Sequence, residues 1–248
     1  MDVLQADILI PFLAILVVVA FLYASVGHGG ASGYLALMAL FSFPVLVMKP
    51  TALLLNIFVS GIAFWYFNKN QHFKWKLFYP FAITSVPMAF LGGYISINTT
   101  LYKQILAVFL VFAILRMLKV FGKQPIQVKE NHLVLSLIVG AGIGLFSGMI
   151  GIGGGIILSP VIVLLAWGTM KQAAAVSALF IFVNSFAGII GFSVNKGSLP
   201  TEAWYFVPIA IIGGALGAMY GSQKFNMKTL KYVLAGVLTI ACIKLFLV

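Results

Sequence analysis

Long apolar runs, joined by short polar connections, occupy nearly the whole chain and limit the folds open to it. The runs cover residues 8–26, 34–48, 51–67, 77–97 and 101–120, and then 133–150, 156–167, 173–194, 204–220 and 229–248. A helix needs about 20 apolar residues to cross the hydrocarbon core of a membrane, and most of these runs approach that length. The pattern predicts an all-α integral membrane protein with about 8–10 membrane segments.

The composition supports a lipid environment. Of the 248 residues, 62% are hydrophobic and only 8% are charged, whereas soluble domains carry about 25% charged residues. The net charge of +11 comes from basic residues that lie between apolar runs, so membrane orientation explains it better than nucleic-acid binding does. We expect a multi-pass protein of the cell inner (plasma) membrane, in contact with lipid and not with nucleic acid.

The two sets of runs repeat each other in order and in local sequence. Val26-Gly27-His28-Gly29-Gly30 corresponds to Ile150-Gly151-Ile152-Gly153-Gly154, and four further matches keep an offset between 124 and 128 residues. Repeats of this kind are typical of secondary transporters. We therefore predict a first membrane repeat over residues 1–121, a cytoplasmic linker over 122–132 and a second membrane repeat over 133–248, which together form one transmembrane domain.

The basic residues indicate how the repeats are oriented. If each repeat makes five passes, or three passes plus a hairpin, 11 of the 15 basic residues gather on one side, and Lys49, Lys103, Lys196 and Lys244 lie on the other. The positive-inside rule then places both termini outside the cell. We therefore expect two inverted repeats, although four passes per repeat would distribute the charges almost equally.

Each repeat contains a glycine cluster that precedes a short apolar run. The clusters consist of Gly27, Gly29 and Gly30 and of Gly151, Gly153, Gly154 and Gly155. Glycine releases the backbone from helical dihedral angles, and unwound backbone at membrane depth persists only where protein or a wet cavity covers it. Each cluster is predicted to form a helix break, or the tip of a re-entrant hairpin, that faces the protein interior.

The helix that follows each cluster begins with N–H groups that have no partner inside that helix. Together with the positive end of the helix dipole, these groups can bind an anion. Ser32 and Ser159 add hydroxyl groups near the two helix starts. Both clusters are therefore candidate substrate-binding sites for a small anion. The competing interpretation is that the glycines only allow helices to pack closely.

Three more polar residues are candidates for substrate binding. His28 is the only histidine in either cluster; it would titrate near neutral pH and could carry charge or a proton, or it could simply donate to a carbonyl. Asn56 and Asn184 lie inside apolar runs, where polar side chains usually face the bundle interior. Each could bind substrate or bond a neighbouring helix.

The sequence offers little for catalysis or for a cofactor. The single cysteine, Cys242, and His28 lie in different runs with no acidic residue near them, which is too few ligands for a metal. The sequence contains no nucleotide-binding loop and no catalytic triad. We predict that the chain is not an enzyme and uses no cofactor.

The two glycine motifs resemble those of the sulfite exporter TauE/SafE family of small bacterial and archaeal transporters. The likeness rests on two halves that each open with a helix running into a glycine motif, and it covers essentially the whole chain. The second motif extends from Gly148 through Ser159-Pro160, and Phe182-Val183-Asn184-Ser185 is also similar. His28 departs from the family pattern, as does Ala36, which replaces the proline matched by Pro160. The resemblance implies transport of sulfite, organosulfonates or related sulfur oxyanions, coupled to the proton gradient.

Competing functional classes remain open. Paired helix breaks in inverted repeats favour a secondary transporter with alternating access over a channel or a static helical bundle. An alternative from a different class is an intramembrane enzyme or assembly factor that handles a sulfur-containing or lipid substrate. The expected partners are a small anionic substrate and membrane lipid, while protons and a second copy of the chain stay open as partners.

Overall fold

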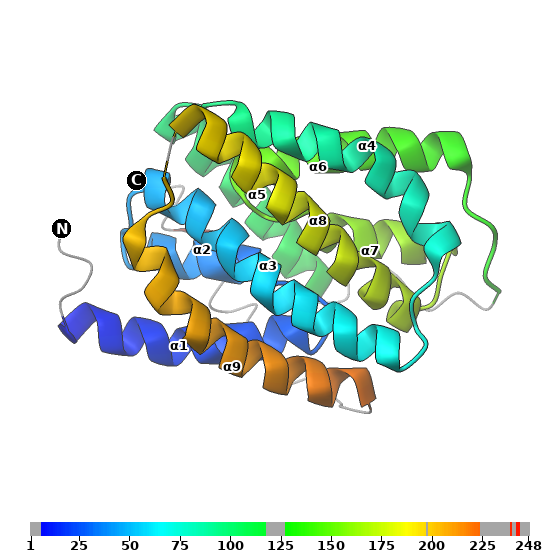
Figure 1. Ribbon diagram of the computed structural model, residues 1–248, viewed down its shortest axis with the longest axis horizontal. Coiled ribbons are helices and arrows are strands. Elements are labelled where there is room, and N and C mark those ends of the chain that lie inside the picture. Colours follow the sequence, from blue (N-terminus) through cyan, green and yellow to red (C-terminus); the bar gives the residue numbers. More distant parts are fainter. Residues whose placement is uncertain (1–5, 118–126, 197, 224–238, 240–241, 244–248) are drawn as a thin grey trace.

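A computed structural model describes residues 6–117, 127–196, 198–223, 239 and 242–243 (Figure 1). These residues form nine α-helices, which confirms the all-helical prediction. The helices are α1 (Ala6–Ala24), α2 (Ala31–Leu40), α3 (Val45–Lys69), α4 (Trp75–Tyr94), α5 (Thr99–Met117), α6 (Leu133–Ile150), α7 (Gly155–Leu164), α8 (Met170–Lys196) and α9 (Thr201–Gln223). The last predicted run, 229–248, lies mostly outside the described residues, as does part of the predicted linker.

Five of the described helices are long and apolar enough to cross a membrane, namely α3, α4, α6, α8 and α9. Their outer faces carry large apolar side chains, such as Ile83 on α4 and Ile138 on α6, which are exposed on the surface of the bundle. Apolar side chains on an outer surface are expected where the surrounding solvent is lipid. The chain is therefore a multi-pass membrane protein.

The predicted short segments are confirmed, since α2 and α7 have ten residues each. One predicted boundary was wrong. The run 34–48 was expected to form one segment, but α2 ends at Leu40 and α3 begins at Val45. Lys49 therefore lies inside α3 and not in a connection between segments. The Lys49 side chain is buried, and its ammonium donates to the carbonyl oxygens of Gly92 (3.2 Å) and Gly93 (3.0 Å). These carbonyls belong to the last turn of α4, where they have no partner within the helix.

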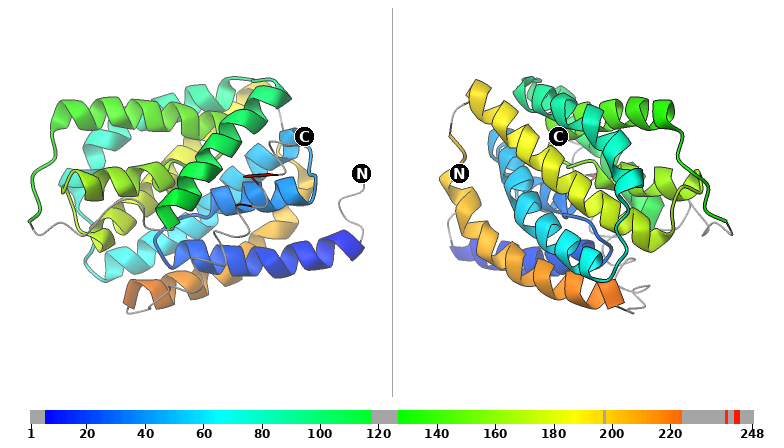
Figure 2. Two further views of the ribbon diagram at one scale, coloured as in Figure 1. Left: turned by 180° about the vertical axis from the view of Figure 1, so that it is seen from behind. Right: turned by 45° about the vertical axis from the view of Figure 1, so that its right-hand side comes forward.

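The helices of the two halves interleave. α1 packs along α9, and α4 packs along α6, at opposite edges of the bundle (Figure 1). Between these pairs, α3 packs against α8 and α9, and α8 also packs against α4. Figure 2 shows α5 crossing the back of the bundle obliquely. The core is therefore built jointly by residues that lie far apart in the sequence.

Stripes of glycine bring the edge helices into close contact. On α9 the stripe faces the backbone of α1, and on α6 it faces the backbone of α4. The α9 contacts pair Gly213 with Val17, Gly217 with Phe21 and Gly221 with Ser25, and the α6 contacts pair Gly140 with Phe81, Gly144 with Ser85 and Gly148 with Ala89. In both sets the residue numbers of the two contacting helices increase in the same direction, so the helices of each pair run parallel. A Cβ at any of these glycines would collide with backbone, so the lack of a side chain is what allows the two helices of each pair to pack closely.

The central helices α3 and α8 run antiparallel. Gly188 of α8 faces Leu53 near the start of α3, and Phe182 faces Gly61 further along α3. The buried amide of Asn56 lies between these two contacts. As a result, the middle of α3 lies against the middle of α8, and the site described next surrounds this crossing.

Candidate functional site

Both glycine clusters interrupt helices, and they share left-handed glycines at two equivalent positions. The second break has a further left-handed glycine, Gly153, whose counterpart Gly29 is not left-handed. Gly27 and Gly151 have φ angles of 75° and 90°, and Gly30 and Gly154 have φ angles of 100° and 80°. Each pair is separated by 124 residues, as are the starts of α2 and α7. Residues with side chains rarely adopt this left-handed conformation, whereas glycine does so without steric cost. The predicted helix breaks are therefore present in both halves.

The two breaks meet at the amide of Asn56 in the middle of α3. A Cβ on Gly29 would collide with the amide oxygen of Asn56, and a Cβ on Gly153 would lie 2.7 Å from its Nδ2 atom. Nδ2 donates to the carbonyl oxygen of Ile152 at 3.4 Å and to the hydroxyl of Ser185 at 3.3 Å. Asn56 thus contacts one break directly, hydrogen-bonds the other and links both to α8.

The amide oxygen of Asn56 is buried without a hydrogen-bond partner. Leaving a buried acceptor unpaired costs roughly 1–3 kcal/mol. Such a group is stable only where packing holds it, and it marks a position at which a ligand or a change of conformation could add a bond. Asn184 also has an unpaired amide oxygen, but its Nδ2 donates to Phe180 of its own helix at 2.9 Å. Of the two predicted asparagines, therefore, Asn56 is the one that the structure joins to the breaks.

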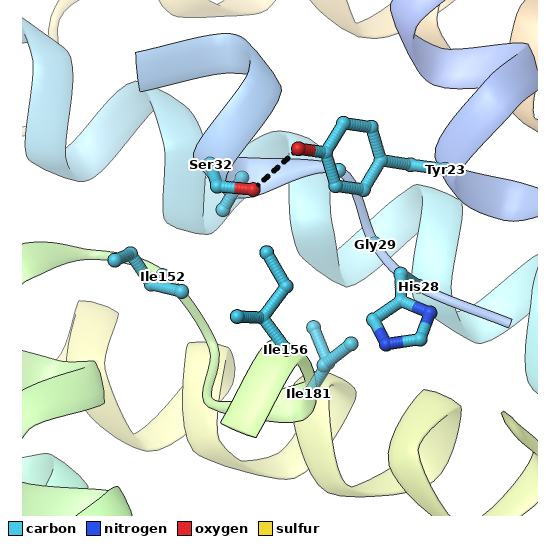
Figure 3. Close-up of a pocket in the computed structure, with 9 residues that line it drawn as sticks. Tyr23, His28, Gly29, Ser32, Ile152, Ile156 and Ile181 are labelled. Carbon is cyan, nitrogen blue, oxygen red and sulfur yellow. Dashed lines mark hydrogen bonds between the residues drawn. The ribbon is translucent and has the colours of Figure 1, made fainter. Parts of the chain in front are cut away.

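A small cavity of about 10 Å³ lies between the two breaks (Figure 3), with room for roughly one water molecule. Its lining consists of Tyr23, His28, Gly29, Gly30, Ala31, Ser32, Ile152, Ile156 and Ile181. One wall is polar, because the Tyr23 hydroxyl and the Ser32 hydroxyl hydrogen-bond at 2.6 Å. The opposite wall is apolar and consists of three isoleucines from the second half of the chain. All nine lining residues are buried in this conformation, and the two walls differ chemically.

His28 connects the first break to the helix that follows the second. Its imidazole is buried, with Nδ1 lying 2.9 Å from the carbonyl oxygen of Val26. Nε2 lies 3.1 Å from the carbonyl oxygen of Gly155 and 3.2 Å from the hydroxyl of Ser159. The Ser159 hydroxyl in turn hydrogen-bonds Ser177 of α8 at 2.6 Å. A chain of three buried polar side chains therefore joins α8, α7 and the first break.

The predicted site residues fall into four places. Gly27, His28, Gly29, Gly30 and Ser32 form the first break and the start of α2, and Gly151, Gly153, Gly154, Gly155 and Ser159 form the second break and the start of α7. Asn56 lies between them, and Asn184 lies on α8 without a hydrogen bond to either break among those described. Whether these residues bind substrate stays a prediction.

Several contributors to the site were not predicted. Tyr23 lies one turn before the first glycine cluster, and its hydroxyl within an apolar run was the signal that could have identified it. Tyr102 on α5 donates to the carbonyl oxygen of Ile150 at 2.9 Å, at the entrance to the second break. Nothing in the sequence pairs Tyr102 with that break, because the contact depends on how α5 crosses the bundle.

Apolar helices that are twice interrupted by glycine turns, and that enclose polar side chains where the turns meet, define a multi-pass membrane protein with an internal polar site. Residues 12–245 match the family described as Sulfite exporter TauE/SafE. The chain therefore belongs to this family of membrane transporters, as the resemblance of its glycine motifs indicated.

Similar proteins occur in bacteria and archaea. The chain is 39% identical over 233 residues to the "Probable membrane transporter protein y4hK" of Sinorhizobium fredii, with 92% of this chain and 94% of that protein covered. It is 26% identical over 200 residues to the "Probable membrane transporter protein MJ0441" of Methanocaldococcus jannaschii, covering 76% of this chain and 74% of the relative. It is also 26% identical over 208 residues to the "Probable membrane transporter protein YunE" of Bacillus subtilis, with 76% of each chain covered. No solved structure shows a significant match.

Proposed function

We propose that this protein is a secondary transporter of small anions, namely sulfite, organosulfonates or related sulfur oxyanions, and that it works by alternating access in the cell inner membrane. The observation that carries the proposal is the meeting of two glycine breaks at Asn56, beside a small cavity whose lining residues are buried. Enclosure is what a transporter needs between its two open states, because a continuous path would dissipate the gradient that drives it.

The chemistry of the cavity favours an anion. Among the described residues no acidic side chain lines it, whereas the hydroxyls of Tyr23 and Ser32 and the imidazole of His28 do. The start of α2 adds backbone N–H groups and the positive end of its dipole. These groups could together hold an oxyanion, and the isoleucine wall would accept a short apolar substituent such as the methyl group of a sulfonate.

We also infer that the halves are inverted repeats. In a repeat, α1 corresponds to α6, α4 to α9 and α3 to α8. The parallel pair α1 and α9 then corresponds to the parallel pair α6 and α4. The equivalent helices α3 and α8 run antiparallel to each other. A two-fold axis that lies in the membrane plane would produce this pattern, whereas an axis along the membrane normal would leave equivalent helices parallel. The two breaks would then approach the centre from opposite sides of the membrane.

Transport is tested in proteoliposomes loaded in turn with sulfite, sulfoacetate, thiosulfate and sulfate. We expect saturable flux of at least one sulfur oxyanion that exceeds the flux in protein-free liposomes and is competed by the other accepted anions. A Gly153→Ala variant that is incorporated at equal density should lose that flux. Equal flux with and without protein for all four anions would reject the proposed function.

Inverted topology is tested with reporter fusions after Asn70, after Glu130 and at the C-terminus. We expect cytoplasmic signals from the first two fusions and an external signal from the third, because the basic residues concentrate near the first two positions. Cytoplasmic signals at all three positions would reject the inverted arrangement, and they would leave the anion site itself untouched.

A further inference from the structure

The imidazole of His28 faces more acceptors than a neutral histidine can satisfy. Nδ1 faces the carbonyl oxygen of Val26 and Nε2 faces that of Gly155, at 2.9 and 3.1 Å. Carbonyl oxygens only accept hydrogen bonds, and a neutral imidazole carries a single N–H. An imidazolium carries two, so only the protonated ring can donate to both carbonyls.

The neutral ring is compatible with a different arrangement. With the proton on Nδ1, the bond to Val26 is kept and Nε2 becomes an acceptor. The hydroxyl of Ser159, at 3.2 Å, can then donate to Nε2 while it accepts from Ser177 at 2.6 Å. In this state the direct bond between His28 and the Gly155 carbonyl is lost. Protonation therefore reverses the direction of the Ser159 bond and adds one bond between the two halves of the chain.

We propose that His28 is the proton-binding residue of the transport cycle and that its protonation stabilises the closed arrangement of the two glycine breaks. This inference rests on the proposed function and names the ion that is coupled to it. The chemical step is reversible protonation: Nε2 takes a proton from water on one side and returns it to water on the other, and no other covalent bond is formed or broken.

Other titratable groups around His28 do not respond in the same pH range. The neighbouring helices contribute the phenols of Tyr23 from α1 and Tyr34 from α2, and phenols titrate near pH 10. From α7 and α8 the facing groups are the hydroxyls of Ser159 and Ser177. The Lys49 ammonium on α3 bonds the end of α4, on the side of the second break. Among the described groups of this site, only the imidazole of His28 has an ordinary pKa close to neutral.

An anion in the cavity and a proton on His28 would each favour binding of the other. His28 lines the cavity, and attraction between opposite charges is strong where water is scarce. By linkage, an anion that binds the protonated form more tightly raises proton affinity by the same factor. The carrier would then move a proton and an anion in the same direction, although the part of the chain that the structure describes contributes no carboxylate to the cavity.

The test exploits the single cysteine of the chain. Cys242→Ala supplies a cysteine-free background, and Ile152→Cys places one thiol in the wall of the closed cavity. The rate at which a methanethiosulfonate reagent labels this thiol reports how often the site opens. Rates are measured between about pH 5.5 and 8, without any anion substrate, in protein with His28 and in protein with His28→Gln. The thiol at position 152 also becomes more reactive as the pH rises, and this effect is present in both proteins. Dividing the two rates at each pH removes it.

We expect labelling of the His28 protein, relative to His28→Gln, to fall roughly 2- to 10-fold as the pH is lowered, which is the contribution of one buried hydrogen bond. His28→Asn should behave as His28→Gln does, which guards against a folding defect of either variant. His72→Gln, in a connection between helices, should leave the pH dependence intact. A ratio that does not change with pH would reject the proton-binding role of His28.

The outcomes for the two proposals can be told apart. Anion flux with a pH-independent labelling ratio would keep the transporter and remove His28 as its proton carrier. A pH-dependent ratio in protein that moves none of the four sulfur oxyanions would keep the proton site and reject the proposed substrate class.

Discussion

The first glycine break, around Gly27 to Gly30, and the second, around Gly151 to Gly154, share part of their backbone geometry but not their chemistry. Left-handed glycines and helix starts recur at an offset of 124 residues. The first break nevertheless presents His28, with Tyr23 and Ser32 beside it, whereas the second presents Ile152 and Ile156. Two left-handed glycines are thus common to both halves, whereas the polar side chains that line the cavity come from the first half.

This difference suggests a division of roles. A break needs glycine because of its backbone angles and its close contacts, so both copies keep glycine. A single small anion needs only one polar wall, and side chains on the opposite wall can then be apolar. On this interpretation the second break supplies a close-fitting surface, and the first supplies the charge and the hydrogen bonds.

The largest effect is expected from a side chain added at the contact between the breaks. Gly153→Ala would place a Cβ 2.7 Å from both Nδ2 of Asn56 and Cγ2 of Ile181, at a φ of 76°. Strain and overpacking together should cost about 2–5 kcal/mol and abolish transport while membrane insertion persists. The matched control is Gly142→Ala, where an added Cβ meets nothing within 4 Å. Equal transport by the two variants would show that the second break need not fit closely.

A second large effect should separate the two buried asparagines. Asn56→Leu removes the bonds to Ile152 and Ser185 and should reduce transport at least about tenfold, which corresponds to roughly 1.4 kcal/mol. Asn184→Leu removes a bond within α8 only and should change transport less. Flux assays at matched protein density compare the two. A larger loss of flux in Asn184→Leu than in Asn56→Leu would show that the site is centred on α8 and not on the middle of α3.

A moderate effect should distinguish the tyrosines that flank the two breaks. Tyr23→Phe removes a hydroxyl from the polar wall and should weaken anion binding about 2- to 10-fold. Tyr102→Phe removes the bond to the Ile150 carbonyl and should lower thermal stability with little change in affinity. Anion-dependent thermal shifts of the purified variants report both quantities. Affinity lost in Tyr102→Phe and kept in Tyr23→Phe would reverse the assigned roles of the breaks.

The smallest effect concerns His72, which lies outside the membrane segments. Partial burial and the nearby Lys171 ammonium lower the pKa of the His72 imidazole. Below about pH 6.5 the His72 imidazole of the unfolded chain takes up a proton, whereas the same imidazole in the folded protein resists protonation. The free energy of unfolding therefore decreases as the pH falls. Because His72 is largely solvated, the loss should stay under about 0.5 kcal/mol.

Thermal unfolding in detergent at about pH 7.5 and 5.5 measures this contribution, in a His28→Gln background that removes the other histidine of interest. His72→Gln should reduce the difference in unfolding temperature between the two pH values. An unchanged difference would assign the pH dependence to other groups.

The sequence by itself determined the class of the protein and the position of its helix breaks. Apolar runs can satisfy their backbone in lipid only as helices, and glycine in clusters such as Gly151 to Gly155 marks where a helix cannot continue. Both signals are local, so they can be read without knowledge of packing. The family followed from the same motifs, because they carry its most specific residues.

Only the tertiary structure decided which side chains share the site. The apolar runs 34–48 and 51–67 leave Lys49 in a connection, yet α3 begins four residues earlier and buries its ammonium against α4. Asn56 and Asn184 are indistinguishable as polar residues in apolar runs, but the crossing of α3 and α8 places only Asn56 between the breaks. The bond from His28 to Gly155 joins residues 127 positions apart. Such contacts depend on the relative placement of whole helices, which packing sets and no local pattern encodes.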